Sequence, residues 1–234
     1  MNGGVEALAA TFMATSVLVL AGTGCQSTAG LTPAEREQVQ AGDRVVVLLR
    51  IQCTIDGQPW ESFAEHGLVE EGIFAFGLGS FETVGVPVPA YPRSLTADSA
   101  RDGWVYLLLA PGTYYIAVLG PINDANYRVA AGDLASLLNS PRWRLEVPEG
   151  VAVVHPGTLL FEGRTTGTLM FGKPILAPNP DAAVVVRDDA DEAGVVAARH
   201  FPPVDSVPFV PLQRWRPGEP RVITTPHDVT RRRQ

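Results

Sequence analysis

Charge is scarce in this 234-residue chain, and lysine is almost absent. Only 18% of the residues are charged, the formal net charge is −7, and Lys173 is the single lysine. A broad nucleic-acid-binding surface needs the opposite sign of charge, so we discount that class of function. The three arginines at 231–233 are a local exception, which we interpret as part of a solvated tail.

Cysteine is also rare. Cys25 and Cys53 are the only two, which permits at most one disulfide within the chain, in an oxidising compartment. Around Cys53, the polar residues Arg50, Gln52 and Thr54 alternate with apolar residues, and residues two apart share one face of a strand. We therefore predict that Cys53 is a small buried hydrophobe rather than a reactive thiol.

Motifs of known catalytic or nucleotide sites are missing. The segment GTLMFGKP at 167–174 matches the spacing of a phosphate-binding loop, but Pro174 stands where a Ser or Thr would hold Mg²⁺. The segment GLGSF at 77–81 lacks the third glycine of a dinucleotide loop. No G-x-S-x-G elbow and no H-E-x-x-H zinc motif occurs. We predict no catalytic residue, no nucleotide and no cofactor.

Metal ligands are not grouped in the sequence either. The histidines are His66, His155, His200 and His227. None has a second histidine or cysteine at ligand spacing, so we predict turn or surface positions for them and no metal site. Asp189 and Asp191 resemble the start of a calcium loop, but Ala193 and His200 replace required ligands. We interpret these acids as helix caps instead.

What the chain does have is an apolar N-terminal run that ends in small residues and Cys25. Residues 7–21 carry no charge, a length that suits a signal peptide and is short for a membrane span. Thr23 and Gly24 then precede Cys25, which resembles the lipobox of bacterial lipoproteins. The pattern departs from the lipobox at Gly22, which takes the usual leucine position. No Lys or Arg precedes Arg36, whereas signal peptides usually begin with positive charge.

From this pattern we expect residues 1–24 to be a lipoprotein-type signal peptide and Cys25 to be the lipid attachment site. An ordinary cleaved secretory signal, an uncleaved anchor and a buried helix are the alternatives. Several acyl chains tether a protein stably, whereas one chain does not. Gln26, rather than an aspartate, follows Cys25, which by resemblance to enteric lipoproteins favours the outer membrane over the inner membrane.

A tether and a short helix are expected at residues 25–42. Thr32 and Glu35 form a capping-box pattern, Pro33 takes the first helical position, and Gly42 closes the helix. Strand signals dominate after that, and the 23 glycines and 20 prolines favour many turns.

The individual strands are expected as follows. A long strand at 44–55 ends in the turn pair Asp56-Gly57, and shorter strands follow within 72–88. Residues 110–113 are predicted to form a hairpin between two apolar strands. Further expectations are a brief helix at 134–138, an alternating strand at 142–147, two strands around 163–167, a strand at 182–187 and a helix at 189–199.

Segment 103–163 resembles a type of bacterial envelope lipoprotein with an immunoglobulin- or transthyretin-like sandwich. The residues that carry the resemblance are Pro111, Gly112, Thr113, Tyr114 and Tyr115 in a PGTYY hairpin, and Val147, Pro148, Gly150, Phe161 and Gly163 in a later strand pair. It covers about a third of the mature chain. The resemblance implies a fold and a location, and it carries no catalytic residue across.

The expected fold is mainly β: an antiparallel β-sandwich at 43–216 with one or two short peripheral helices, preceded by a signal peptide helix and followed by a flexible tail at 217–234. The expected function is a membrane-anchored lipoprotein of the bacterial cell envelope that acts as a non-catalytic binding or scaffold module. Its expected partners are the membrane, through the lipid, and an unidentified envelope protein. The alternative is an exported enzyme or metal-binding protein whose site is assembled only in the fold.

Overall fold

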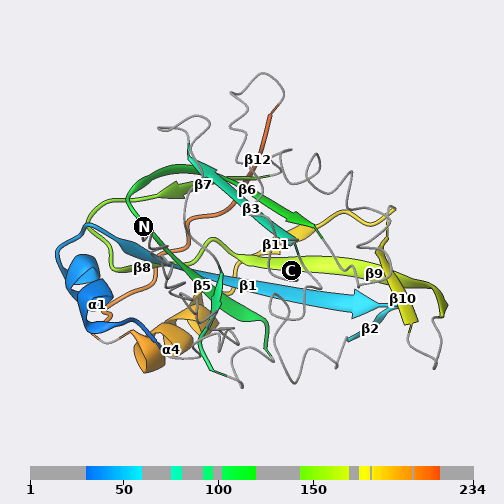
Figure 1. Ribbon diagram of the computed structural model, residues 1–234, viewed down its shortest axis with the longest axis horizontal. Coiled ribbons are helices and arrows are strands. Elements are labelled where there is room, and N and C mark those ends of the chain that lie inside the picture. The colour runs from blue at the N-terminus through cyan, green and yellow to red at the C-terminus, as the bar shows by residue number, and fades with distance from the viewer. Residues whose placement is uncertain are drawn as a thin grey trace, which may run out of the picture.

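The computed structural model describes residues 30–59, 75–80, 92–96, 102–119, 143–168, 174–179, 181–201 and 203–216. Within these residues the protein is mainly β, with two helices, as expected (Figure 1). The helices are α1, Pro33–Gln40, and α4, Ala190–His200. The signal peptide at 1–24, Cys25, the strand segment at 81–88, the helix at 134–138 and the tail at 217–234 all lie outside the described residues.

The described strands form two sheets. The larger sheet has eight strands, of which five follow the order β10-β9-β1-β5-β4, while β11 pairs with β9, and β2 and β8 pair with β1. Its strands are β1 Val45–Ile55, β2 Gln58–Pro59, β4 Arg93–Ser94, β5 Trp104–Leu109, β8 Val153–Val154, β9 Thr158–Thr168, β10 Pro174–Pro178 and β11 Val185–Arg187. The smaller sheet has the order β12-β7-β6-β3, with β3 Ala75–Ser80, β6 Gly112–Leu119, β7 Trp143–Val147 and β12 Gln213–Arg214.

The larger sheet is mixed, which corrects the expectation of antiparallel strands. β1 pairs antiparallel with β5 but parallel with both β8 and β9. The first five residues of β1 are all buried, because both faces of this central strand are covered there. Such a strand suits parallel pairing, and its sequence pattern does not indicate the direction of its neighbours.

The hairpin predicted at 110–113 is also wrong. β5 pairs with β1 and β4 in the larger sheet, whereas β6 pairs with β7 and β3 in the smaller one. The chain therefore crosses from one sheet to the other at Ala110 and Pro111. Each of the two apolar strands finds a partner distant in sequence, so turn residues between them did not imply that they pair.

One long strand replaces the two strands predicted around 163–167. β9 runs through Gly163 and Gly167 without a turn, and its second half pairs with β10. The register shifts there, so that Ile175 lies opposite Gly167 while the next residue, Leu176, lies opposite Thr165. The glycine thus marks a bulge inside a strand rather than a strand end.

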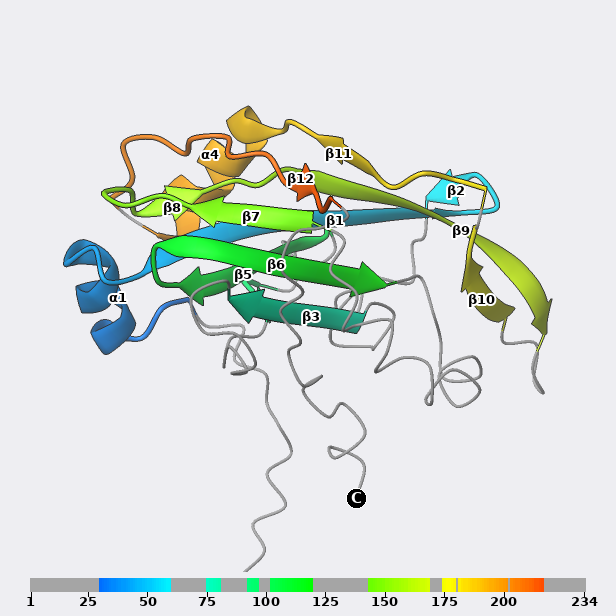
Figure 2. The same ribbon diagram turned by 90° about the horizontal axis from the view of Figure 1, so that it is seen from above.

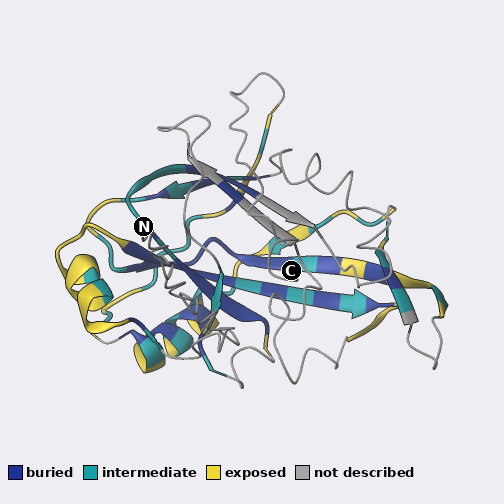
Figure 3. Ribbon diagram, in the orientation of Figure 1, coloured by how far each residue is buried: buried dark blue, intermediate teal, exposed yellow. Residues whose placement is uncertain are grey.

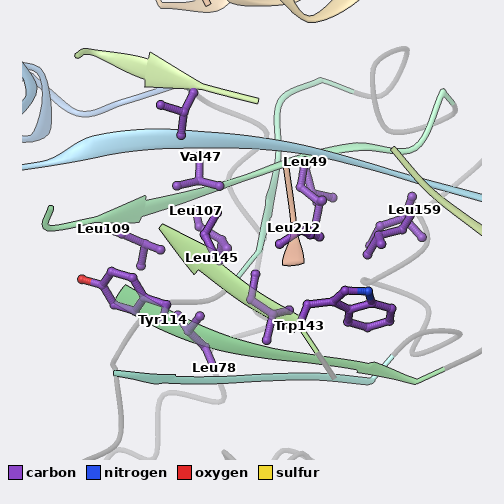
Figure 4. Close-up of a cluster of buried hydrophobic side chains, with 14 of the residues drawn as sticks. Val47, Leu49, Leu78, Leu107, Leu109, Tyr114, Trp143, Leu145, Leu159 and Leu212 are labelled. Carbon is purple, nitrogen blue, oxygen red and sulfur yellow. The ribbon is translucent and has the colours of Figure 1, made fainter. Parts of the chain in front are cut away.

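The larger core cluster is made by side chains of both sheets. Odd-numbered residues of β1, such as Val47 and Leu49, meet Tyr114, Trp143 and Leu145 of the smaller sheet (Figure 4). The predicted alternation of β7 is confirmed, because its residues 143, 145 and 147 are buried and the two between them are partly exposed. Cys53 lies on the same apolar face as predicted, 7% exposed.

A second core cluster covers the opposite face of the larger sheet. Here Val46, Leu48, Trp104 and Tyr106 pack with Ala193 and Ala197 of α4 and with Leu31 before α1. Figure 2 places α4 on the side of β1 that is away from β6 and β3. The two helices thus lie on the face of the larger sheet that the smaller sheet leaves uncovered.

The capping box predicted for α1 is confirmed. The Thr32 hydroxyl accepts from the Glu35 amide at 3.3 Å, and the Glu35 carboxylate accepts from the Thr32 amide at 2.9 Å. Glu35 also accepts from Arg93 Nη2 at 2.7 Å, and the Arg93 guanidinium lies 5.4 Å from the centre of the Tyr106 ring. One carboxylate therefore both starts the helix and ties it to the sheet.

Candidate functional site

The part of the larger sheet that the helices leave open carries a groove of about 560 Å³. Even-numbered residues of β1 form its floor together with outward residues of β9 and β11, which are in register. Arg50 lies opposite Thr158, which lies opposite Arg187; Gln52 lies opposite Leu160, which lies opposite Val185. Figure 3 shows the partly exposed residues that alternate with buried ones along β1. The groove is therefore built from three strands with polar and apolar side chains in rows.

A cluster of paired charges stands where the groove meets α4. Asp189 accepts from Arg187 Nε at 2.6 Å, from Arg187 Nη2 at 2.8 Å and from the Thr158 hydroxyl at 2.7 Å. Its side chain is only 8% exposed, and the pairing with Arg187 is bidentate. The cluster therefore joins β9, β11 and the start of α4.

Arg50 completes this cluster from β1. Its Nη1 lies 2.5 Å from Glu192 and 3.5 Å from Asp189, and its Nε donates to the carbonyl of Asp102 at 2.9 Å. The guanidinium carbon lies 5.1 Å from the centre of the Trp104 ring. Arg50 is thereby fixed by charge, by a backbone acceptor and by an aromatic face.

These contacts shift the pKa of the central carboxyl. The hydrogen bonds from Arg187 chiefly hold the pKa of Asp189 at about 2, against an ordinary value of 3.8, and burial opposes the shift. Bonding to Asp189 likewise raises the pKa of Arg187. Asp189 is thus a fixed anion that neutralises its neighbours rather than a proton donor or acceptor near neutral pH.

The helix-cap role predicted for Asp189 is wrong. Asp189 occupies the N-cap position of α4, but its side chain makes no capping hydrogen bond. The Ala190 amide instead donates to the Asp188 carboxylate at 2.9 Å. The Asp189 oxygens already accept hydrogen bonds from Arg187 and Thr158. The neighbouring Asp188 therefore accepts the hydrogen bond from the first amide of the helix.

His155 contradicts the predicted turn or surface position, because it is 0% exposed. Its Nδ1 lies 2.8 Å from the Leu48 carbonyl oxygen, and its ring lies between Trp104 and Phe209, with centroid distances of 5.5 and 6.1 Å. The Nε2 atom is buried and has no hydrogen-bond partner. By contrast, His200 is partly exposed at the end of α4, and His66 and His227 lie outside the described residues.

No protein family, curated protein or solved structure matched this chain. The groove and the charged cluster therefore stand on their own geometry.

Among the described residues, the lining of the groove includes the carboxylates of Asp102 and Glu162 but no histidine. Across the described residues, no three His, Cys, Asp or Glu side chains come close enough to hold a metal ion. No helix in the described part of the chain has the length and apolar character needed to cross a membrane.

Sequence reasoning missed both Arg50 and His155. The alternation that placed Cys53 on the apolar face also placed Arg50 on the other face. The sequence could not indicate the partners of Arg50 at and just before the start of α4, which lie 139 and 142 residues away. The only local feature that marks His155 in the sequence is the Pro156-Gly157 pair directly after it, which interrupts an apolar stretch. Tyr114 and Tyr115, two of the residues that carry the family resemblance, are both buried.

Proposed function

We propose that the protein is a lipid-anchored lipoprotein of the bacterial cell envelope that acts as a non-catalytic binding or scaffold module. The anchor rests on the lipobox-like sequence before Cys25 and on the state of Cys53. Cys53 is free and buried, and burial raises the pKa of its thiol to about 12. A thiol buried on this apolar face is poorly placed to form a disulfide, which supports the proposal that Cys25 is available for acylation.

The proposed anchor would hold the body close to the membrane. Leu31 is buried in the second core cluster, and it lies six residue steps after Cys25 in the sequence. Six extended residue steps span at most about 20 Å. The end of the body that carries α1 would then lie nearest the lipid, and Gln26 favours the outer membrane as its location.

The binding role rests on the groove beside the charged cluster. Arg50 and Arg187 are already neutralised by Asp189 and Glu192, so the groove offers hydrogen-bonding groups and the carboxylates of Asp102 and Glu162 rather than free positive charge. Val185, 52% exposed, adds an apolar contact at its rim. This mixture suits a polar protein segment, and we propose an envelope protein partner for it. The two sheets that share one core would form the β-sandwich that supports this surface.

The lipid anchor is tested by labelling with radioactive palmitate in the native host. We expect label on the wild-type protein and on Cys53→Ala, and no label on Cys25→Ser. Absence of label from the wild type, together with its release by osmotic shock, would show that the anchor proposal is wrong.

The groove is tested by a photo-crosslinking amino acid placed at Val185 in cells. Val195 supplies a matched control, because it is an exposed valine, 63% exposed, on α4 and outside the groove lining. We expect a discrete crosslinked protein at position 185 and none at position 195. Equal crosslinking at both positions, or none at either, would contradict a binding role for the groove.

A further inference from the structure

The β8–β9 junction interrupts the ladder along β1 at one point. The Val46 amide donates to the Ala152 carbonyl, so even-numbered residues of β1 direct their backbone groups toward β8. If this parallel register continued for two more residues, the backbone nitrogen of Pro156 would lie opposite the Leu48 carbonyl. Proline has no N–H to donate to that carbonyl. Pairing resumes at Thr158, opposite Arg50, after one extra residue.

The His155 side chain takes the place of the missing amide. A carbonyl oxygen only accepts, so His155 Nδ1 must carry the proton in its bond to Leu48. In the neutral ring Nε2 is then the unprotonated nitrogen, and this atom is buried with no hydrogen-bond partner for a second proton. The ring therefore fits its site only as the neutral tautomer with hydrogen on Nδ1.

The backbone of the same residue holds a segment that we call the strap, residues 208–212. The His155 amide donates to Pro208, the Val210 amide donates to the His155 carbonyl, and the Leu212 amide donates to Pro156. Phe209 of the strap also covers the His155 ring, at 6.1 Å between centroids. The imidazole and the strap thus meet at one junction.

Three charged groups act electrostatically on the His155 ring. They are Arg50 of β1 and, in the segment before α4, Asp188 and Asp189. Burial is the largest effect and lowers the pKa of His155. The hydrogen bond to the Leu48 carbonyl and the two carboxylates oppose this shift, whereas Arg50 adds to it. The packed neighbours from β5 and the strap, Trp104 and Phe209, are neutral.

We propose that His155 is an acid-sensitive latch whose neutral ring holds the strap and whose protonated ring releases it. Protonation places a second N–H, with a positive charge, where no acceptor is present. Of the two segments that pack on the His155 ring, β5 and the strap, the strap is held by fewer backbone pairs. Trp104 belongs to β5, which pairs with β1 at six positions, whereas the strap pairs with His155 through an isolated bridge at Phe209.

The direction of the pH effect follows from proton binding. Because the pKa of His155 is lowered in the latched state, the released state binds more protons between that pKa and the ordinary value of about 6.5. The latched state is therefore fully favoured above about pH 6.5 and loses stability as the pH falls below it. Release would uncover the part of the larger core cluster that Leu212 covers.

Hydrogen–deuterium exchange of the full-length protein at pH 7.5 and pH 5.0, corrected for chemical exchange rates, tests this latch. We expect the protection of the Val210 and Leu212 amides to fall at least about tenfold at pH 5.0, while β5 stays protected. His155→Asn keeps an amide donor near the position of Nδ1 and cannot titrate, so its strap should show no such fall. His200→Asn, a control outside the latch, should behave as the wild type does.

Equal protection of the strap at both pH values in the wild type would overturn the latch, and so would the same fall in His155→Asn. If His155→Asn does not fold, the His155 ring of the wild type is titrated by NMR instead. Strap opening must then follow the ring's midpoint, and opening while the ring stays neutral would overturn the proposal. The latch does not depend on Cys25 or on the groove, so these outcomes are independent of the anchor and crosslinking tests.

Discussion

Gly103 lies where the turn before β5 passes directly over β1. Its φ is +83°, and a Cβ built there would lie 1.9 Å from the Ile51 carbonyl oxygen. The Ile51 amide donates to the Gly103 carbonyl at 2.9 Å, so the two backbones are held together. A side chain at this position would have to separate them.

We therefore predict that Gly103→Ala destabilises the protein by about 3 kcal/mol or more, from strain plus the clash. Gly150→Ala is the matched control, because Gly150 also has a positive φ, +73°, but open space around it. Strain alone should cost the control about 1 kcal/mol. Urea unfolding of both variants measures this difference in the free energy of unfolding. Equal losses in the two variants would show that Gly103 does not lie as close to the Ile51 carbonyl as described.

The charged cluster has a pH signature at Asp189. Its folded pKa of about 2 lies below the ordinary value of 3.8, so it stabilises the fold above about pH 3.8 and this contribution disappears as the pH falls to about 2. Asp189→Asn should lower the free energy of unfolding at pH 7 by up to about 2 kcal/mol and flatten its acid dependence. The exposed Asp191→Asn removes the same charge nearby. If both variants behave alike in urea titrations at pH 7 and pH 3, the cluster does not stabilise the fold.

Residue environments could be predicted from the sequence only where a local pattern decides them. The alternation in β1 was enough to place Cys53 on the buried face. It could not reveal that Asp189 accepts from Thr158, because that contact depends on β11 lying next to β9. His155 was misplaced for the same reason: its burial follows from the strap and from β5, both distant in sequence.

At the scale of elements, α1 shows how far local signals reach. Thr32, Pro33 and Glu35 specify where the helix begins, and the structure agrees in each case. The link from Glu35 to Arg93 was not predictable, because β4 lies 58 residues further along the chain. Strand pairing could not be predicted for a similar reason. The turn residues at 110–113 indicate that the chain changes direction, but they do not indicate which sheet it enters next.

The helix start gives a direct prediction. Thr32→Ala removes the hydroxyl that accepts from the Glu35 amide, and we expect it to lower the free energy of unfolding by about 1 kcal/mol. Thr32→Ser keeps the hydroxyl and should cost little. Circular dichroism during urea unfolding measures both variants, and indistinguishable midpoints would mean that the capping box contributes nothing.

At the scale of the whole molecule, the larger sheet divides its outer face between two roles. The helices cover the half of β1 that carries Val46 and Leu48, and the groove occupies the half that carries Gln52 and Thr54. The charged cluster lies at the boundary and fixes the start of α4 against the groove. A mainly β fold with peripheral helices was predictable from composition and turns, but this division depends on which strands pair.

The proposed role of the protein depends most on the chemical state of Cys25. Mass spectrometry of the mature protein from the native host measures that state directly. The account predicts that residues 1–24 are absent and that the N-terminal residue, Cys25, carries the added mass of several acyl chains. A mature N-terminus at any other residue, or an unmodified Cys25, would contradict it.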